Sequence, residues 1–376
     1  MTDDLKRLPL DALHREIGGK MVPFAGYEMP VQYPMGVKAE HLHVRSKAGL
    51  FDVSHMGQAE LVSDGDHETT ARLIEELVPG EIVGLKPGRI RYTLLLDERG
   101  GVLDDLMVTR LPDRVGRLFL VVNAAVKGQD FALMERHFAG RARLEVMDRS
   151  LLALQGPTAH AVMAGLDPDA ATMPFMSMRE TTLGGVPVRL SRCGYTGEDG
   201  YEISVANADA EGLARSLLDH PDVAPIGLGA RDSLRLEAGL CLYGHDMDAR
   251  DTPVSAGLTF AIGKRRREEG GFAGAERVVR ELREGTETLR VGLKPLGRAP
   301  AREGAEVQSE DGAPIGTVTS GGFGPTFDAP VAMGRVKTAY AEPGTRVRLI
   351  VRGKPLDAEV VRLPFVEQRY YRGTKS

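Results

Sequence analysis

The sequence contains no tryptophan, only two cysteines among its 376 residues, and no long apolar run. Cys193 and Cys241 lie far apart without CxxC spacing, which excludes a disulfide framework and favours a reducing compartment. No apolar stretch approaches the roughly 18 residues that a membrane-spanning helix needs. The N-terminal segment MTDDLKRLPLDAL lacks the apolar region of a signal peptide. We therefore expect a soluble, cytoplasmic protein without membrane association.

Neither sign of charge dominates the chain, since the formal net charge is −5. We expect no nucleic-acid partner, because such a protein would carry a basic face. The sequence also lacks a P-loop and a GxGxxG motif that opens a helix after a strand. A hydrophobic content of 42% over this length is sufficient for two or three domains with cores of their own.

Strands and helices alternate through the first three quarters of the chain. The segment RYTLLLDERGGVLDDLMVTRLPDRVGRLFLVVNAA predicts three strands in a meander, with DERGG and PDRVG as turns. Apolar residues at helical spacing predict helices on both sides of this meander and further along the chain. These predicted helices cover residues 63–78, 123–138, 207–220, 229–244 and 275–285.

The amino-acid composition and the periodicity of the sequence change near Glu284 to Thr288. From Thr288 onward the chain is rich in glycine, proline and valine, forms short strand patterns and lacks helical periodicity. Lysine and arginine outnumber the acids there, whereas the preceding part of the chain is acidic. We expect a separate C-terminal all-β domain, either a small barrel or a sandwich.

Two adjacent acids, Asp104 and Asp105, interrupt the apolar strand pattern GGVLDDLMVTR. Successive strand side chains point to opposite faces, so these two acids cannot share a proton with each other. Both have apolar neighbours, and a carboxylate in such surroundings must find hydrogen-bond donors or bind a proton more tightly. From these residues alone, a capping role at a strand edge remains open for either acid.

Two further segments place charged side chains in unusual positions. The loop SRCGYTGEDG holds three glycines that let the backbone approach a ligand closely, and the following strand pattern alone predicts that Glu202 is exposed. Arg231 lies in or near the first turn of a predicted helix, where the helix dipole disfavours a cation. Arg231 therefore either reaches into water or is held by an acid or a ligand.

The histidines and one basic run give weaker evidence of a functional role. His41 and His43 resemble a metal-binding pair, but no third ligand is evident and we expect no metal. His55 and His245 are candidate general bases, with a structural role as the alternative. The basic run Lys264 to Arg267 is either a solvated face or a surface for an acidic partner.

Eight segments taken in order resemble one family: KMVPFAGYEMPVQYP, LFDVSHMG, GGVLDDLMVT, LALQGP, GYTGEDGYE, GLGARDSLRLEAG, LYGHDMD and TSGGFGPT. They are similar to the aminomethyltransferase of the glycine cleavage system, the T-protein, from about Leu8 to Tyr371. The resemblance implies a three-lobed α+β fold with a central folate channel and a C-terminal β-barrel domain. The folate-binding region would cover residues 1–284, with a first lobe of about 1–50 plus 145–284 and an inserted second lobe of about 51–144. The barrel would cover residues 285–376.

The resemblance also implies a reaction and a set of site residues. The enzyme would transfer the methylene carbon of an aminomethyl group from the lipoyl arm of H-protein to tetrahydrofolate, a co-substrate, and release ammonia. Asp105 matches the catalytic acid, whereas Asp104 keeps a structural role. The ligand-binding positions fall on Glu202, Arg231 and Tyr370, and the remaining channel-lining candidates are Tyr92, Asn123, Tyr195 and Met56. Without tryptophan, any aromatic walls must come from tyrosine or phenylalanine.

Two other functions stay open at this point. One is a folate-dependent demethylase of the same superfamily that acts on a methylated amine or sulfonium. The other is a non-catalytic folate-binding accessory protein, of the kind that aids iron–sulfur assembly. That group carries a cysteine-centred motif where this chain has GYTGEDGYE.

Overall fold

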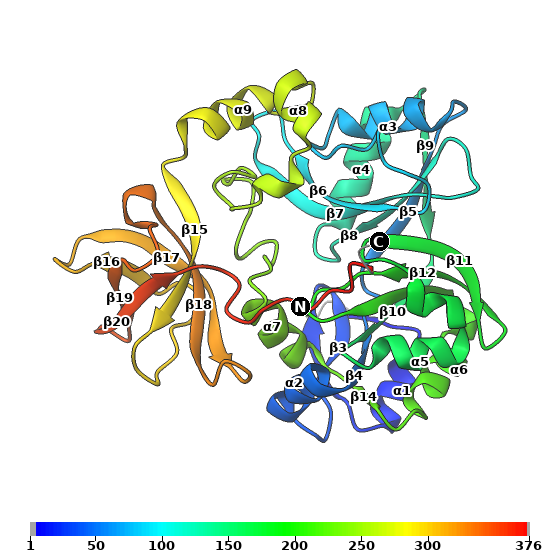
Figure 1. The fold of residues 1–376 in the computed structure, drawn as a ribbon, viewed down its shortest axis with the longest axis horizontal. Coiled ribbons are helices and arrows are strands. Elements are labelled where there is room, and N and C mark those ends of the chain that lie inside the picture. The colour runs from blue at the N-terminus through cyan, green and yellow to red at the C-terminus, as the bar shows by residue number, and fades with distance from the viewer. Residues whose placement is uncertain (1–4, 374–376) are drawn as a thin grey trace.

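Two large open sheets and a closed barrel form the centres of three lobes in the computed structural model, which describes residues 5–373 (Figure 1). Residues 1–4, part of the segment judged unlike a signal peptide, and residues 374–376 lie outside the described residues. Within the described range, no helix combines the length and the apolar character needed to cross a membrane.

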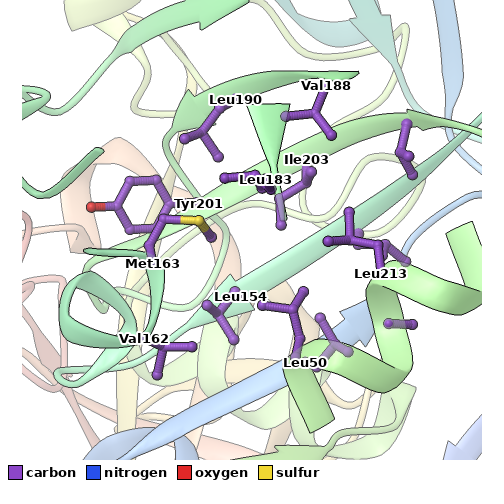
Figure 2. Close-up of a cluster of buried hydrophobic side chains, with 14 of the residues drawn as sticks. Leu50, Leu154, Val162, Met163, Leu183, Val188, Leu190, Tyr201, Ile203 and Leu213 are labelled. Carbon is purple, nitrogen blue, oxygen red and sulfur yellow. The ribbon is translucent and has the colours of Figure 1, made fainter. Parts of the chain in front are cut away.

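The first lobe is built on a six-stranded sheet with the order β11-β12-β13-β10-β4-β14. Its strands are β4 (Ala48–Asp52), β10 (Arg149–Gln155), β11 (Ser177–Leu183), β12 (Val186–Arg192), β13 (Gly200–Ala206) and β14 (Val223–Pro225). Strand β4 precedes the second lobe in the chain, whereas the other five strands follow it. Leu50, Leu154 and Ile203 from three of these strands meet in the core shown in Figure 2.

Helices and a small sheet complete the first lobe. The helices are α1 (Asp11–Glu16), α2 (Val37–Ser46), α5 (Ala159–Leu166), α6 (Asn207–Leu218) and α7 (Leu228–Glu237), with the 3₁₀ helix η1 (Pro168–Thr172). The small sheet holds β1 (Lys6–Arg7), β2 (Lys20–Phe24) and β3 (Tyr27–Gln32) in the order β1-β3-β2. Helix α7 runs between the first lobe and the barrel (Figure 1), so residues on it can reach a space shared by both.

The second lobe contains a five-stranded sheet with the order β6-β7-β8-β5-β9. Its elements are β5 (Gly57–Val62), α3 (His67–Glu75), β6 (Ile90–Leu96), β7 (Val102–Arg110), β8 (Arg117–Val122), α4 (Lys127–Phe138) and β9 (Arg143–Met147). The antiparallel pairing of β6, β7 and β8 confirms the predicted meander. Helices α3 and α4 cover one face of this sheet, where Leu106, Val108 and Met134 share a core.

The C-terminal lobe is a closed six-stranded barrel with the order β15-β18-β17-β16-β19-β20. Its strands are β15 (Thr288–Pro295), β16 (Glu306–Ser309), β17 (Pro314–Gly324), β18 (Ala329–Lys337), β19 (Arg346–Val351) and β20 (Lys354–Val361), and η3 (Thr338–Tyr340) follows β18. Pairing of β15 with β20 closes the ring. The all-β prediction is therefore confirmed in its barrel form. The chain reaches the barrel through η2 (Thr259–Ala261), α8 (Lys264–Glu269) and α9 (Ala275–Glu284).

A buried ionic network joins the barrel to the first lobe. Arg45 of α2 donates to Glu198 at 2.8 Å and to Glu237 at the end of α7 at 3.0 Å. The backbone N–H of Thr326, in the barrel, donates to the other oxygen of Glu237 at 2.8 Å. Arg369 in the C-terminal segment also pairs with Glu198 at 2.6 Å. These bonds hold the C-terminal segment, which carries Tyr370, against the first lobe.

Candidate active site

A cavity of about 1800 Å³ lies where the three lobes meet. The second lobe contributes β6 and β7 to its wall, the first lobe contributes β13 and α7, and the barrel contributes Thr319 to Gly321. All eight predicted site residues line it: Met56, Tyr92, Asp105, Asn123, Tyr195, Glu202, Arg231 and Tyr370. The fold thus brings the predicted residues together, while their individual roles remain predictions.

Asp105 points into the cavity from the middle of β7. Asn123, just after β8, donates its side-chain N–H to Asp105 Oδ1 at 2.7 Å, and Tyr92 of β6 makes a side-chain hydrogen bond to the same carboxyl group. Burial raises the pKa of Asp105 to about 7, and the neighbouring Asp104 carboxylate adds to this rise. Asp105 can therefore both accept and release a proton near neutral pH.

Asp104 lies on the opposite face of β7 and is fully buried. The backbone N–H of Asn123 donates to Asp104 Oδ2 at 2.9 Å, and its side-chain amide donates to Oδ1 at 2.8 Å. The alternation of buried and half-buried residues along β7 confirms that the two acids face apart. A single asparagine nevertheless contacts both carboxyl groups, because it follows the neighbouring strand β8.

The exposed position predicted for Glu202 from its strand pattern is wrong. Strand β13 is central in its sheet, and Glu202 lies opposite Ala153 and Ser191 on the neighbouring strands. That face of the sheet borders the cavity instead of bulk solvent. The thiol of Cys193 donates a hydrogen bond to the Glu202 carboxylate, whereas burial raises the pKa of Glu202. Glu202 thus presents a hydrogen-bond acceptor to the cavity.

Arg231 also faces the cavity, from the first turns of α7. Its guanidinium lies over the Tyr195 ring, 4.8 Å from the ring centroid, and the Tyr195 hydroxyl donates to the carbonyl of Cys241. Within residues 5–373, Arg231 Nη1 is buried without a hydrogen-bond partner, and burial lowers the pKa of the guanidinium. A buried donor without an acceptor is costly, so this geometry favours a ligand over water as the partner of Arg231.

Aromatic pairs form two parts of the cavity wall. Tyr370 stacks on Phe175 with ring centroids 4.1 Å apart and an interplanar angle of 14°. Tyr92 stacks on Phe260 at 5.8 Å and 21°. The prediction that tyrosine and phenylalanine supply the walls is confirmed, although no sequence pattern selects Phe175 or Phe260.

The histidine hypotheses find little support. His55 lines the cavity but is buried, and burial lowers its pKa to about 3, so its imidazole is neutral and a poor base at pH 7. His245 is exposed and contacts Glu303 at 2.7 Å. His41 contacts Ser233, Glu237 and Thr326, whereas His43 contacts backbone carbonyls. Among residues 5–373, no group of three or more histidine, cysteine or acidic side chains could hold a metal ion.

The interpretation of Lys264 to Arg267 as a solvated basic face is wrong for Arg265 and Arg266. Arg265 pairs with Glu75 and Glu81 of the second lobe, and Arg266 is buried with a bond to the Glu75 carbonyl. Arg267 stays exposed, as expected, although its guanidinium donates to two backbone carbonyls. The run therefore ties α8 to the second lobe, and the sequence could not show that two glutamates approach it.

Sequence reasoning missed a third acid, Asp130, in the first turn of α4. Its side chain is 2% exposed and hydrogen-bonds to Asp104 behind the cavity wall. An acid in the first turn of a helix is common and gives no signal of burial. Only the packing of α4 against β7 brings Asp130 to the acid pair.

The arrangement suits a flat, polar heteroaromatic ligand. Glu202 offers an acceptor, Arg231 offers a donor, and the stacked tyrosines offer apolar walls. Asp105 then lies beside the bound ligand as a group that can handle a proton or stabilise a developing positive charge.

The comparisons with known proteins agree with this geometry. Residues 10–266 match the family described as the GCVT N-terminal domain, and residues 289–367 match the glycine cleavage T-protein C-terminal barrel domain. The chain is 46% identical to the mitochondrial aminomethyltransferase of Gallus gallus, over 98% of this chain and 94% of that protein. It is 45% identical to the mitochondrial aminomethyltransferase of Homo sapiens, over 98% of this chain and 91% of that protein.

A solved structure leads to the same family. The crystal structure of glycine cleavage system aminomethyltransferase T from Bartonella henselae superposes with a TM-score of 0.92 at 45% identity, covering 98% of this chain and all of that one. The chain therefore belongs to the glycine cleavage T-protein family, and its activity is that of a glycine cleavage system aminomethyltransferase.

Proposed function

We propose that this enzyme moves the methylene carbon of an aminomethyl group from the lipoyl arm of H-protein to tetrahydrofolate. The products are 5,10-methylenetetrahydrofolate, ammonia and the dihydrolipoyl arm. One observation carries the proposal: a half-buried carboxyl group, Asp105, with its pKa raised to about 7, shares a cavity with Arg231 Nη1, a buried donor that has no hydrogen-bond partner in the described part of the chain.

In this reaction Asp105 is the catalytic residue. As ammonia leaves, the methylene carbon, still bonded to sulfur, becomes a thionium-like electrophile, and the N5 atom of tetrahydrofolate attacks it and loses its proton. The C–S bond then breaks, the sulfur takes up a proton to give the dihydrolipoyl arm, and N10 loses its proton as it closes the methylene bridge. A carboxylate beside N5 orients the pterin, handles its proton and stabilises the developing positive charge. A pKa near neutrality suits proton exchange at physiological pH better than the ordinary value of an aspartate.

The remaining residues bind the folate. The Glu202 carboxylate can accept two hydrogen bonds from the aminopyrimidine edge of the pterin, and Arg231 can donate to a ring acceptor. Tyr370, stacked on Phe175, offers an aromatic surface to the ring system. Tyr92, Asn123, Tyr195 and Met56 complete the cavity wall.

The size of the cavity supports a second occupant. Its volume of about 1800 Å³ exceeds the roughly 300–1,000 Å³ that is usual for a pocket with one small ligand. We infer that the lipoyl arm of a docked H-protein enters the same cavity and brings its aminomethyl carbon to the folate. We also propose a cytoplasmic location, which suits the two free cysteines.

Ammonia release from aminomethyl-loaded H-protein tests the proposal. We expect tetrahydrofolate to stimulate release strongly and to become methylenetetrahydrofolate in equal amount. Folate binding without release would instead support an accessory folate-binding protein. Demethylation of a methylated amine without H-protein would support the demethylase function.

A further inference from the structure

We propose that Asp104 and Asp130 share one proton and form a singly charged acid pair directly behind Asp105. In this arrangement they are positioning residues, which fix Asn123 and set the proton affinity of the catalytic carboxyl group. The pairing itself stands on the fold, whereas its role for Asp105 rests on the proposed function.

The contacts require a shared proton. Asp104 is fully buried on β7, Asp130 is 2% exposed on α4, and their carboxyl groups hydrogen-bond to each other. Only a carboxyl group that keeps its proton can donate such a bond to another carboxyl group. Two ionised carboxylates in contact within a buried site would repel each other strongly.

The remaining hydrogen bonds identify the partner that holds the proton. Burial raises the pKa of Asp104 as well, but both of its oxygens accept N–H bonds from Asn123, which stabilise the ionised form and oppose that rise. Asp130 Oδ2, by contrast, is buried and accepts no N–H bond from residues 5–373. Burying a carboxylate without such donors costs more than burying a neutral acid, so Asp130 is the protonated member.

The charged and titratable groups around Asp130 also favour its protonated form. Asp104 and Asp105 face it from β7, and both raise its pKa, although burial contributes most. Its pKa rises to about 9. Tyr243, from the loop after α7, also faces these acids, and burial raises its pKa to about 12, so it stays neutral. The first turn of α4 favours an anion, but this influence is weaker than contact with a second carboxylate.

The pair acts on the cavity through one amide group. Asn123 Nδ2 donates to Asp104 Oδ1 at 2.8 Å and to Asp105 Oδ1 at 2.7 Å, so the buried acid fixes the orientation of the amide beside the catalytic one. The single negative charge on Asp104 also raises the pKa of Asp105. Neutralising Asp130 by protonation leaves this charge in place, whereas neutralising Asp104 removes it.

Carbon-13 NMR of full-length protein labelled at the aspartate carboxyl carbons tests the pairing without any turnover. At about pH 8, between the values near 7 for Asp105 and near 9 for Asp130, we expect one protonated aspartate signal. The signal should vanish in Asp130→Asn, and it should remain in Asp105→Asn and in the exposed control Asp113→Asn. In Asp104→Asn it should titrate at lower pH than in the unmodified protein, because Asp130 loses the neighbouring charge while its burial is retained. Fully ionised aspartates in the unmodified protein, or a signal that survives Asp130→Asn, would overturn the proposal.

The pH profile of turnover tests the positioning role. Asp104→Asn should move the acid limb of kcat to lower pH by about one unit or more, because Asp105 loses a neighbouring charge. Asp130→Asn mimics the protonated acid and should leave the position of that limb unchanged. A shift in Asp130→Asn equal to that in Asp104→Asn would mean that both acids are ionised and would refute the shared proton. If no variant has an acid limb while the NMR signal behaves as expected, the role of Asp105 fails and the pairing stands.

Discussion

At the scale of single residues, side chains alternate between the two faces of strand β7, and this alternation gives the neighbouring Asp104 and Asp105 different chemistry. Asp104 faces the buried side of β7 and receives two hydrogen bonds from Asn123. Asp105 faces the cavity and has its pKa raised to about 7. One acid is thus held in place by hydrogen bonds, and the other is a group that can exchange protons near neutral pH.

Replacing Asp105 with asparagine tests this division. The amide keeps the shape and can still contact Tyr92 and Asn123, so we expect the dissociation constant of tetrahydrofolate to stay within a few-fold. Turnover should fall by about 10²–10⁴-fold, because the amide can neither exchange a proton nor balance positive charge. Steady-state kinetics with loaded H-protein and folate titration measure both quantities. Full turnover in this variant would refute the assigned role.

The same variant should also gain stability at neutral and basic pH. The folded-state pKa of Asp105 is raised from 3.8 to about 7, so ionisation of this acid destabilises the fold, fully above about pH 7 and not below about pH 4. Removing the charge should raise the free energy of unfolding by roughly 1–4 kcal/mol at about pH 8 and by less at about pH 5. Denaturant unfolding at both pH values, with Asp113→Asn as an exposed control, measures the difference. An equal or negative change at the higher pH would contradict the raised pKa.

The environments of some of these residues could be predicted from the sequence, and those of others could not. Strand periodicity was sufficient to separate the faces of Asp104 and Asp105, because side-chain alternation is a local property. Glu202 was misread from the same kind of pattern, because no local signal says that its face of β13 borders a cavity. Asp130 and Cys193 meet their partners only through tertiary packing, and nothing in their sequence neighbourhoods indicates those contacts.

At the scale of elements, charged residues join helices and lobes that local sequence cannot connect. The run Lys264 to Arg267 appears as a basic surface in the sequence, but Arg265 is neutralised by Glu75 and Glu81 from the second lobe. The helix predicted over residues 229–244 ends earlier, at Glu237, because Gly239 adopts a positive φ of 68°. The other predicted helices form where their apolar periodicity places them.

The Arg45 network gives a prediction at this scale. Arg45→Met would leave Glu198 and Glu237 buried without their shared cation, which should cost about 3–5 kcal/mol in the free energy of unfolding. Arg72→Met, which removes an exposed pair with Glu68 on α3, is the matched control and should cost less than about 1 kcal/mol. Denaturant unfolding of the two variants measures the contrast. Similar small losses in both would show that the network does not hold the lobes together.

At the scale of the whole molecule, the active site exists only where three lobes meet. We propose lobe boundaries near residues 50, 145 and 284, so that the second lobe is an insertion in the first. This division is supported by β4, which precedes the second-lobe strands in the chain but lies between β10 and β14 of the first lobe. A barrel at the C-terminal end could be predicted from composition, but its contribution of Thr319 to Gly321 to the cavity wall could not.

Because the cavity spans the lobes, folate should stabilise the whole molecule. At a concentration of about one hundred times the dissociation constant, a ligand adds about 2.7 kcal/mol to the free energy of unfolding. We expect a clear rise in Tm with tetrahydrofolate in the unmodified protein and in Asp105→Asn. Glu202→Ala should lose most of this rise at the same folate concentration, because the cavity loses its acceptor for the pterin edge. An equal rise in Glu202→Ala would remove Glu202 from the binding site.

A crystal structure of the enzyme with bound tetrahydrofolate tests the central claim most directly. The account predicts that the Asp105 carboxyl group lies within hydrogen-bonding distance of the reduced pterin beside its reactive nitrogen N5, with Glu202 and Arg231 on the pyrimidine ring. It also predicts that space for a lipoyl arm remains on the other side of that nitrogen. A pterin bound away from β7, with Asp105 in contact only with solvent, would contradict it.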